Sequence, residues 1–347
     1  MCLKFPKRNS PSPPLAPLPD SIIQYIRKLE LSDIDRVSAT PNPALEPYFD
    51  VLRDLLTAPQ VRDLSLDSIH RDYFSEDFKG YFSSLHHSLT SLSLTNFACG
   101  STKDLFSFIS EFRNLRSLAI SNFLWALPHD TRDVEPFKEI KWRLGLLRLR
   151  QLDLNLLYSP AHIVEDFTLL MSSIAAETII DFRYRCFGDG GLEWLPDILS
   201  RAIHLQHLCV SFRHGEGLRR LGPLGLEHSS ELQMITFDDI VFFKPGIMTD
   251  IPLSEEFEWI TPFLDSAQSG ALRRVSFRFR NLPTPPAIFA PNPDDALGDS
   301  HLRGLNNVSV FVNDGLSRGG KEALELFKDL FPVAASRGIL HVGFERF

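Results

Sequence analysis

The sequence has few cysteines, and none of them is paired in a motif. Only 4 of the 347 residues are cysteine, namely Cys2, Cys99, Cys186 and Cys209. This is too few, and too scattered, for a disulfide scaffold, and no C-x-x-C spacing indicates a zinc or redox site. A reducing compartment, cytoplasmic or nuclear, is therefore expected.

The sequence also lacks a long apolar run and an excess of positive charge. No stretch approaches the roughly 18 uninterrupted apolar residues of a membrane span, and the first 20 residues lack the apolar run of a signal peptide. Lys and Arg total 36 against 44 Asp and Glu, a net charge of −8. This balance argues against a general nucleic-acid or anionic-membrane binder. Neither nucleic acid nor membrane is an expected partner.

What the sequence does contain is a recurring unit with apolar residues at positions 1, 4, 6 and usually 9. The first unit begins at residue 26 and the last at residue 339. The ten intervals between successive starts range from 26 to 40 residues, and their mean is about 31. We count eleven units. Their first positions are Ile26, Val61, Leu89, Leu115, Leu149, Ile179, Leu205, Leu232, Leu272, Leu305 and Ile339.

Each unit reads as a short strand followed by a helix. Positions 4 and 6 alternate with polar residues, which is strand periodicity. Helical stripes lie between the strands, at 48–56, 105–112, 164–174 and 324–331. A doubly wound sheet would give strands that are apolar on both faces. Here one face is small and polar, which favours a solenoid with helices on one side of a parallel sheet.

The chain ends and insertions complete the expected organisation. Residues 1–21 hold six prolines and are predicted to be a disordered lead. Residues 22–347 are predicted to form the solenoid, with a long loop at 281–300 that is rich in Pro, Asp and Ala.

The phrase Ile26-x-x-Leu29-x-Leu31 and its copies resemble the L-x-x-L-x-L strand of leucine-rich repeats. This resemblance covers nearly the whole chain and implies an α/β horseshoe with a parallel sheet on its concave face. Two features depart from the family pattern. Position 9 carries Ile, Phe or Leu in place of Asn or Cys, and the period exceeds the usual 20–29 residues or so.

Long, irregular, Phe-rich repeats of this kind are similar to those of fungal F-box/leucine-rich-repeat-like proteins, with 28 Phe in this chain. That resemblance implies a substrate-recognition role in an SCF-type ubiquitin ligase. Leu18-Pro19 and the apolar residues up to Leu29 resemble the first half of an F-box. However, Pro41 and Pro43 would break a helix in the second half. An absent or degenerate F-box is expected, and binding of the ligase adaptor requires a restored one.

Three motifs have residue types that could carry chemistry, but none is complete. Gly315-x-x-x-x-Gly320-Lys321-Glu322 lacks the final Ser or Thr of a phosphate-binding loop. His204-x-x-His207-x-Cys209 has metal-ligand types, but on a strand His204 would point away from the other two. Gly188-Asp189-Gly190-Gly191 reads as a tight turn. We therefore expect neither an enzyme nor a cofactor or metal site.

The polar strand face is the expected binding surface, because it would be the concave face of a horseshoe. Arginine is enriched at interfaces and binds carboxylate or phosphate through two N–H groups. A docking patch for an acidic or phosphorylated protein segment is one interpretation; a neutral ladder, with the arginines balanced by aspartates including Asp238, is the other. The candidate residues are Asp153, Asp181, Arg183, Arg185, His207, Arg274 and Arg278.

The predicted function is non-catalytic protein binding through this face, of the F-box substrate-recognition type. The alternative is a repeat horseshoe that wraps and regulates an enzyme or GTPase, with no link to a ubiquitin ligase.

Overall fold

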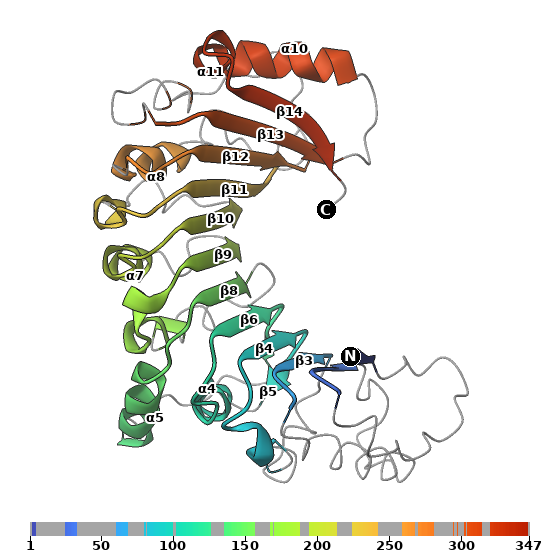
Figure 1. Cartoon of the computed structure of the whole chain (residues 1–347), viewed down its shortest axis with the longest axis vertical. Helices are drawn as coiled ribbons and strands as arrows, with labels where there is room; N and C mark the ends of the chain where they lie inside the picture. Colours follow the sequence, from blue (N-terminus) through green and yellow to red (C-terminus); the bar gives the residue numbers. More distant parts are fainter. Residues whose placement is uncertain are drawn as a thin grey trace, which may run out of the picture. The chain divides into compact units, whose positions relative to one another are not determined.

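The computed structural model divides the chain into two compact units, an N-terminal unit (Met1–Ala175) and a C-terminal unit (Ala176–Phe347) (Figure 1). The structure describes residues 2–4, 25–32, 60–68, 80, 82–99, 102–125, 135–156, 167–168, 170–187, 194–213, 224–241, 259–267, 270–280, 294, 297, 302, 304–313 and 320–345.

The N-terminal unit contains a parallel sheet in which each strand pairs with the next one along the chain. Two short strands, β5 (Ala98–Cys99) and β7 (Leu124–Trp125), pair separately. The strands of the main sheet are β1 (Cys2–Lys4), β2 (Lys28–Ser32), β3 (Asp63–Asp67), β4 (Ser91–Thr95), β6 (Ser117–Ser121) and β8 (Gln151–Leu156).

The C-terminal unit repeats this arrangement, again with parallel pairs between consecutive strands. Its strand order follows the chain order, without the reversal that marks a doubly wound sheet. The strands are β9 (Asp181–Phe187), β10 (His207–Arg213), β11 (Met234–Ile240), β12 (Arg274–Phe279), β13 (Asn307–Asn313) and β14 (Leu340–Glu345).

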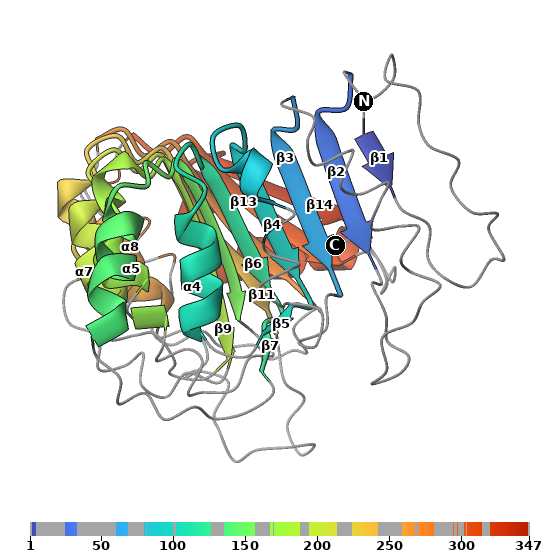
Figure 2. The ribbon, with the colours of Figure 1, turned by 90° about the horizontal axis from the view of Figure 1, so that it is seen from below.

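Helices α4 and α5 lie on one side of their sheet in Figure 2, as α7 and α8 do on one side of theirs. The α-helices are α4 (Thr102–Ser110), α5 (Glu135–Gly145), α7 (Leu195–Arg201), α8 (Ile260–Ser266), α10 (Gly320–Leu330) and α11 (Pro332–Ser336). Single 3₁₀ turns are η3 (Ser83–Leu85), η4 (Ala176–Thr178) and η6 (Leu226–His228).

The structure confirms a strand at each of the eleven predicted positions. The predicted helical stripes at 105–112 and 324–331 correspond to α4 and α10, and the stripe at 164–174 contains helical backbone at 167–168 and 170–173. The stripe at 48–56 lies outside the described residues. Each core strand forms because its two central apolar side chains, such as Leu64 and Leu66 in β3, are buried while their neighbours are partly exposed.

Two parts of the expected organisation differ from the structure. Cys2–Lys4, assigned to a disordered lead, form β1 and pair with Lys28–Glu30 of β2; the rest of that lead is outside the described residues. Within the predicted loop at 281–300, Asp294 and Leu297 have helical backbone and are fully buried. The high Pro and Asp content led to a loop assignment at a place where the chain packs against the core.

A backbone hydrogen bond recurs between consecutive strands, at the edge of the sheet where the strands begin. The N–H of Arg62 donates to the carbonyl of Arg27 at 2.9 Å, and the same position of each later strand in the unit repeats this bond. In the C-terminal unit, Gln206, Gln233, Arg273 and Asn306 make the equivalent donations. Since the bond recurs, each unit keeps one register regardless of the length of the connection between strands.

The other end of β3, β4 and β6 carries a residue with positive φ. Ser68, Asn96 and Asn122 have φ values of 58°, 48° and 52°. Asn tolerates this conformation, and its amide finds partners in the neighbouring repeats. Asn96 Nδ2 donates to Asp67 Oδ1 at 2.9 Å, and Asn122 Nδ2 donates to Asn96 Oδ1 at 3.2 Å. The turn directs the next residue inward: Phe97 and Phe123 are fully buried in the unit's core.

Candidate functional site

The structure brings six of the seven predicted site residues onto one face of the C-terminal sheet. Register pairs Asp181 with His207, His207 with Met234, and Met234 with Arg274, which makes one row across four strands. Arg183, Arg185 and Arg278 lie further along the same strands, on the face opposite the buried aromatic core. We call this surface of β9–β14 the polar face. The seventh, Asp153, lies in β8 of the N-terminal unit.

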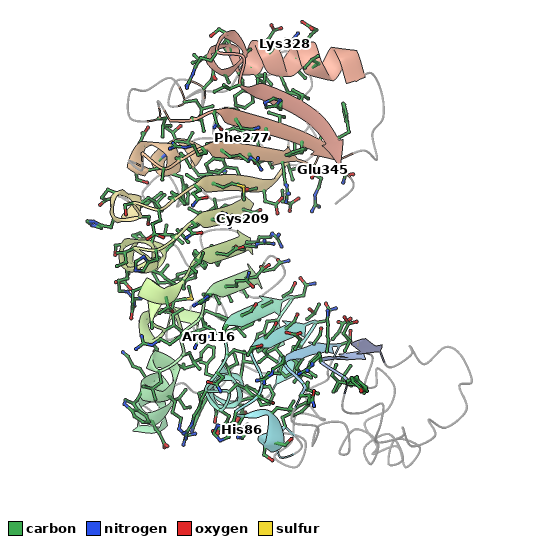
Figure 3. The ribbon with its side chains drawn as sticks, viewed as in Figure 1. His86, Arg116, Cys209, Phe277, Lys328 and Glu345 are labelled. Atoms are coloured by element: carbon green, nitrogen blue, oxygen red, sulfur yellow. The ribbon has the colours of Figure 1, made fainter. Side chains whose placement is uncertain are left out.

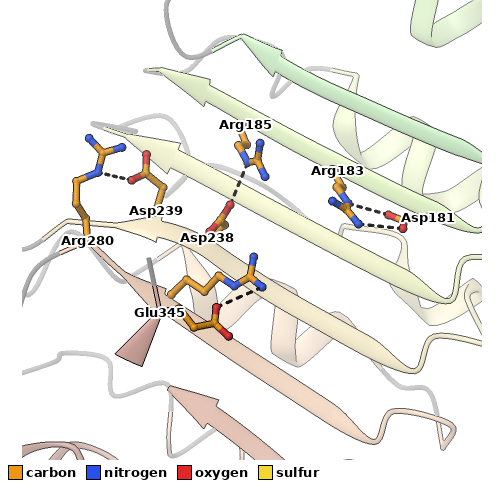
Figure 4. Close-up of polar contacts among 8 residues, drawn as sticks. Asp181, Arg183, Arg185, Asp238, Asp239, Arg280 and Glu345 are labelled. Carbon is orange, nitrogen blue, oxygen red and sulfur yellow. Dashed lines mark hydrogen bonds and ion pairs between the residues drawn. The ribbon is translucent and has the colours of Figure 1, made fainter. Parts of the chain in front are cut away.

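Strand β9 pairs with β10, on which Cys209 lies (Figure 3). Two arginines of β9 are held by aspartates (Figure 4). Arg183 forms a two-pronged contact with Asp181 of its own strand, with Nε–Oδ1 at 3.2 Å and Nη2–Oδ2 at 3.4 Å. Arg185 reaches across β10 to β11, where its Nε donates to Asp238 Oδ2 at 3.0 Å. The Arg185–Asp238 pair is the less exposed of the two, with 23% and 11% of the side chains exposed. The register places Ser211 between these residues, and Ser211 is fully buried.

Two further ion pairs extend the network toward β12 and β14. Arg278 Nη2 lies 3.9 Å from Glu345 Oε2, and Arg280 Nε donates to Asp239 Oδ1 at 2.6 Å. The sequence analysis did not select Asp239, Arg280 or Glu345. Asp239 has a φ of 56° and lies where the β11–β12 register shifts, so a bulge places it beside Arg280. A bulge breaks the two-residue alternation, which is why alternation alone could not assign this residue to the polar face.

These contacts bear on the two expected descriptions of the arginines. Arg183, Arg185 and Arg278 are paired with carboxylates, as the neutral-ladder interpretation expected for Asp181 and Asp238. Arg274, which is exposed like Arg183, differs from them because it has no ion pair within the residues that the structure describes. Among the described residues, the polar face therefore carries ion pairs within and between strands, with Arg274 outside them, and it is not a continuous basic zone.

A row of small side chains runs along the middle of this face. The sequence predicted that these side chains are exposed to water, but they are buried. Thr236, Ser276 and Ser309 are only 5–6% exposed. They are in register with one another on β11, β12 and β13. The rows on either side carry longer side chains, including Met234 and Arg278, which shield the short ones from water. The alternating sequence pattern therefore predicted a higher exposure for these residues than the structure shows.

Cys209 continues the row of small side chains on β10, in register with Arg183 and Thr236. Burial, followed by the negative charge of Asp238, raises the pKa of its thiol to about 12. Because the thiolate is the nucleophile and the metal ligand, a thiol that stays protonated near neutral pH suits neither role.

We therefore expect Cys209 to resist alkylation at pH 8 in the folded protein. A variant with Cys2, Cys99 and Cys186 replaced by serine leaves Cys209 as the only thiol. Its reaction with iodoacetamide, followed by mass spectrometry, is expected to be at least 100-fold slower in native buffer than in denaturant. Equal rates in the two conditions would show that Cys209 is accessible and reactive.

The other chemistry-bearing motifs make ordinary structural contacts where they are described. His204 Nδ1 lies 2.9 Å from Glu231 Oε1, away from His207 and Cys209. The described residues contain no group of three or more His, Cys, Asp or Glu side chains that could hold a metal ion. The Gly315–Glu322 motif joins the end of β13 to the beginning of α10 at Gly320. The Gly188–Gly191 turn lies outside the described residues.

No family model matches the sequence, and no curated protein matches it either. Within the described residues, no helix is long and apolar enough to cross a membrane. The fold and the site together define an α/β protein whose consecutive strands form parallel sheets, and the polar face of its C-terminal unit is crossed by ion pairs.

Proposed function

We propose that this protein is a non-catalytic binding module of the leucine-rich-repeat type, which recognises another protein through the polar face of β9–β14. The observation that carries the proposal is the sequential parallel pairing of strands with an identical starting point in each repeat. Repeat architectures of this kind present a broad strand surface to protein partners rather than a deep pocket.

The ion-paired arginines support a recognition role for the polar face. Guanidinium groups held by carboxylates at fixed positions present their remaining N–H donors without a large loss of side-chain entropy. Arg274 is exposed and forms no ion pair with the described residues, and it suits an acidic or phosphorylated segment of a partner. We propose a cytoplasmic or nuclear setting and, by resemblance to fungal F-box/leucine-rich-repeat-like proteins, recognition of substrates for a ubiquitin ligase.

The test is affinity capture of partners from fungal cell extract with the full chain, read by mass spectrometry. The face variant carries Arg183→Ser, Arg274→Ser and Arg278→Ser, and leaves the more buried Arg185 in place. We expect it to lose at least tenfold in recovery of the partners. The matched control, Lys141→Ser, Arg201→Ser and Lys328→Ser, removes three cations from helices α5, α7 and α10 and should retain full recovery.

Three outcomes separate the alternatives. Equal recovery by the face and control variants would contradict binding through the polar face. Co-recovery of the ligase adaptor would support the F-box role. Partners consisting of one enzyme or GTPase, with the adaptor absent, would favour the regulatory alternative.

A further inference from the structure

A second cationic feature lies in the N-terminal unit, at the edge of the sheet where the strands begin. The backbones of Arg27, Arg62, Thr90, Arg116 and Arg150 hydrogen-bond one to the next, at 2.7–2.9 Å. These residues therefore occupy equivalent positions of five consecutive repeats. Four of the five are arginine, and all four are exposed. We call Arg27, Arg62, Arg116 and Arg150 the arginine row.

The fold does not require arginine at these positions. Thr90 makes the same backbone contacts as its arginine neighbours. In the C-terminal unit the equivalent backbone contacts are made from Ile180, Gln206, Gln233, Arg273 and Asn306, only one of which is charged. That residue, Arg273, directs Nη1 to the carbonyls of Gly270 and Gly304. The row is thus a property of the N-terminal unit and not of the repeat.

The charge of the row is not neutralised within the described part of the chain. None of its four arginines forms an ion pair there. The nearby carboxylates Glu111 and Glu139 are both engaged by Arg143, and Glu30 is engaged by Lys28. Asp63, directly after Arg62, is the remaining carboxylate of these strand starts.

Hydrogen bonds orient part of the row. Arg62 Nη1 donates to the carbonyl of Ser88 at 3.0 Å, and Arg116 Nη1 donates to the carbonyl of Arg148 at 3.1 Å. Each of these contacts points a guanidinium along the edge toward the next repeat and uses only one of its five N–H groups. Both arginines are exposed residues.

Exposed apolar side chains lie at the β8 end of the row. Trp142 and Leu146 are 66% and 51% exposed, and Leu146 is four residues before Arg150. Trp142 belongs to the last turn of α5, and Leu146 directly follows the end of that helix. Tryptophan and arginine are both enriched among the hot spots of protein interfaces.

We propose that the arginine row and the Trp142–Leu146 pair form a docking site for an extended, Asp- and Glu-rich polypeptide segment that ends in an apolar residue. Four strand spacings of about 4.8 Å give the row a span of about 19 Å, which an extended peptide covers with about six residues. Carboxylates along such a segment can each accept two hydrogen bonds from a guanidinium group and carry the opposite charge. This site is separate from the polar face and does not depend on the function proposed for it.

A peptide suits this surface better than nucleic acid or an anionic membrane. Both of those carry large, dense negative charge, and the chain as a whole has a net charge of −8. A short acidic segment is recognised locally, because charges beyond about 8–10 Å are screened at physiological salt.

The test uses the full chain and a fluorescein-labelled probe peptide of six glutamates followed by Leu-Phe, with affinity measured by fluorescence anisotropy. The row variant carries Arg27→Ser, Arg62→Ser, Arg116→Ser and Arg150→Ser, and we expect its affinity to fall at least tenfold. A matched control removes four cations from the C-terminal unit and should keep the wild-type affinity. Its substitutions are Arg201→Ser, Arg273→Ser, Arg280→Ser and Lys328→Ser.

Two further variants keep the test decisive. Arg27 and Arg150 make no side-chain hydrogen bond in the described structure, so Arg27→Ser with Arg150→Ser leaves the edge contacts intact and should still weaken binding at least threefold. Trp142→Ser should weaken binding of the Leu-Phe probe several-fold, with no change for a probe that ends in Gly-Ser.

The proposal is overturned if the row and control variants bind the probe equally, or if the wild-type chain does not bind it at all. It is also overturned if a thymidine oligonucleotide or phosphatidylserine vesicles bind through the row more tightly than the peptide.

Discussion

Replacing Phe237 by alanine is expected to lower the free energy of unfolding of the C-terminal unit by about 3–5 kcal/mol. Phe237 is fully buried in β11. Its ring lies 5.3 Å from that of Phe277, 5.5 Å from that of Trp259 and 6.1 Å from that of Phe263. Truncation removes these contacts and leaves a cavity, because the rings of Phe277 in β12 and of Trp259 and Phe263 at α8 cannot all move into the space.

Urea unfolding followed by tryptophan fluorescence measures this effect, since Trp259 reports on the same cluster. Phe344→Ala is the matched control, because Phe344 lies on the outermost strand of the unit's sheet and is 41% exposed. We expect a loss below about 1 kcal/mol for the control. A loss of similar size for both variants would mean that the aromatic cluster does not dominate the core.

The second large effect is expected for Asp294→Ala, which should cost about 2–3 kcal/mol. The Asp294 carboxylate is fully buried and accepts hydrogen bonds from the backbone N–H groups of Val333 and Ala334. These are two of the N–H groups that α11 leaves without partners at its beginning, next to Pro332. Alanine would leave both donors buried and unsatisfied.

Asp294→Asn keeps one acceptor oxygen and is expected to recover about half of that loss. Asp329→Ala serves as the control because Asp329 is exposed on α10, and its effect should stay within about 0.5 kcal/mol. Thermal unfolding of the three variants distinguishes the outcomes. If Asp294→Ala were as stable as the wild type, water would have to satisfy the first turn of α11 instead.

The strands could be predicted because their signal is local and redundant. In β4, Leu92 and Leu94 are buried while Ser91, Ser93 and Thr95 remain partly exposed. The leucines and the polar residues around them therefore indicate independently which face of the strand packs against the core. A strand is present at all eleven predicted positions, although in β11, β12 and β13 polar positions of the alternating pattern are buried as well. The amino-acid composition likewise predicts a core rich in aromatic residues, because phenylalanine brings apolar area and has no polar group that needs a hydrogen-bond partner.

The partners of charged side chains could not be predicted, because they depend on register between strands far apart in the sequence. Arg185 and Asp238 are 53 residues apart, and nothing local relates them. The bulge at Asp239 also shifts which residues face outward. β1 was missed because three residues without periodicity carry no strand signal of their own.

The arginine row, by contrast, was readable from the sequence. Arginine occupies the second position of the repeat in four of the first five units, between the apolar residue at position 1 and the strand. The sequence analysis compared only the alternating strand positions, which lie on the face of the sheet. A comparison of every position of the repeat would have detected a charge pattern at its edge.

The recurring hydrogen bond between strand starts fixes the strands, whereas the connections between them can vary in length. The connection between β4 and β6 belongs to an interval of 26 residues and that between β11 and β12 to one of 40, yet both strand pairs begin from the same backbone contact. Lengthening a connection costs little closure entropy, whereas one residue inserted inside a strand would turn its leucines outward. New segments can therefore be inserted between strands, by evolution or by design, and change the surface available to partners. The strands and their register stay the same.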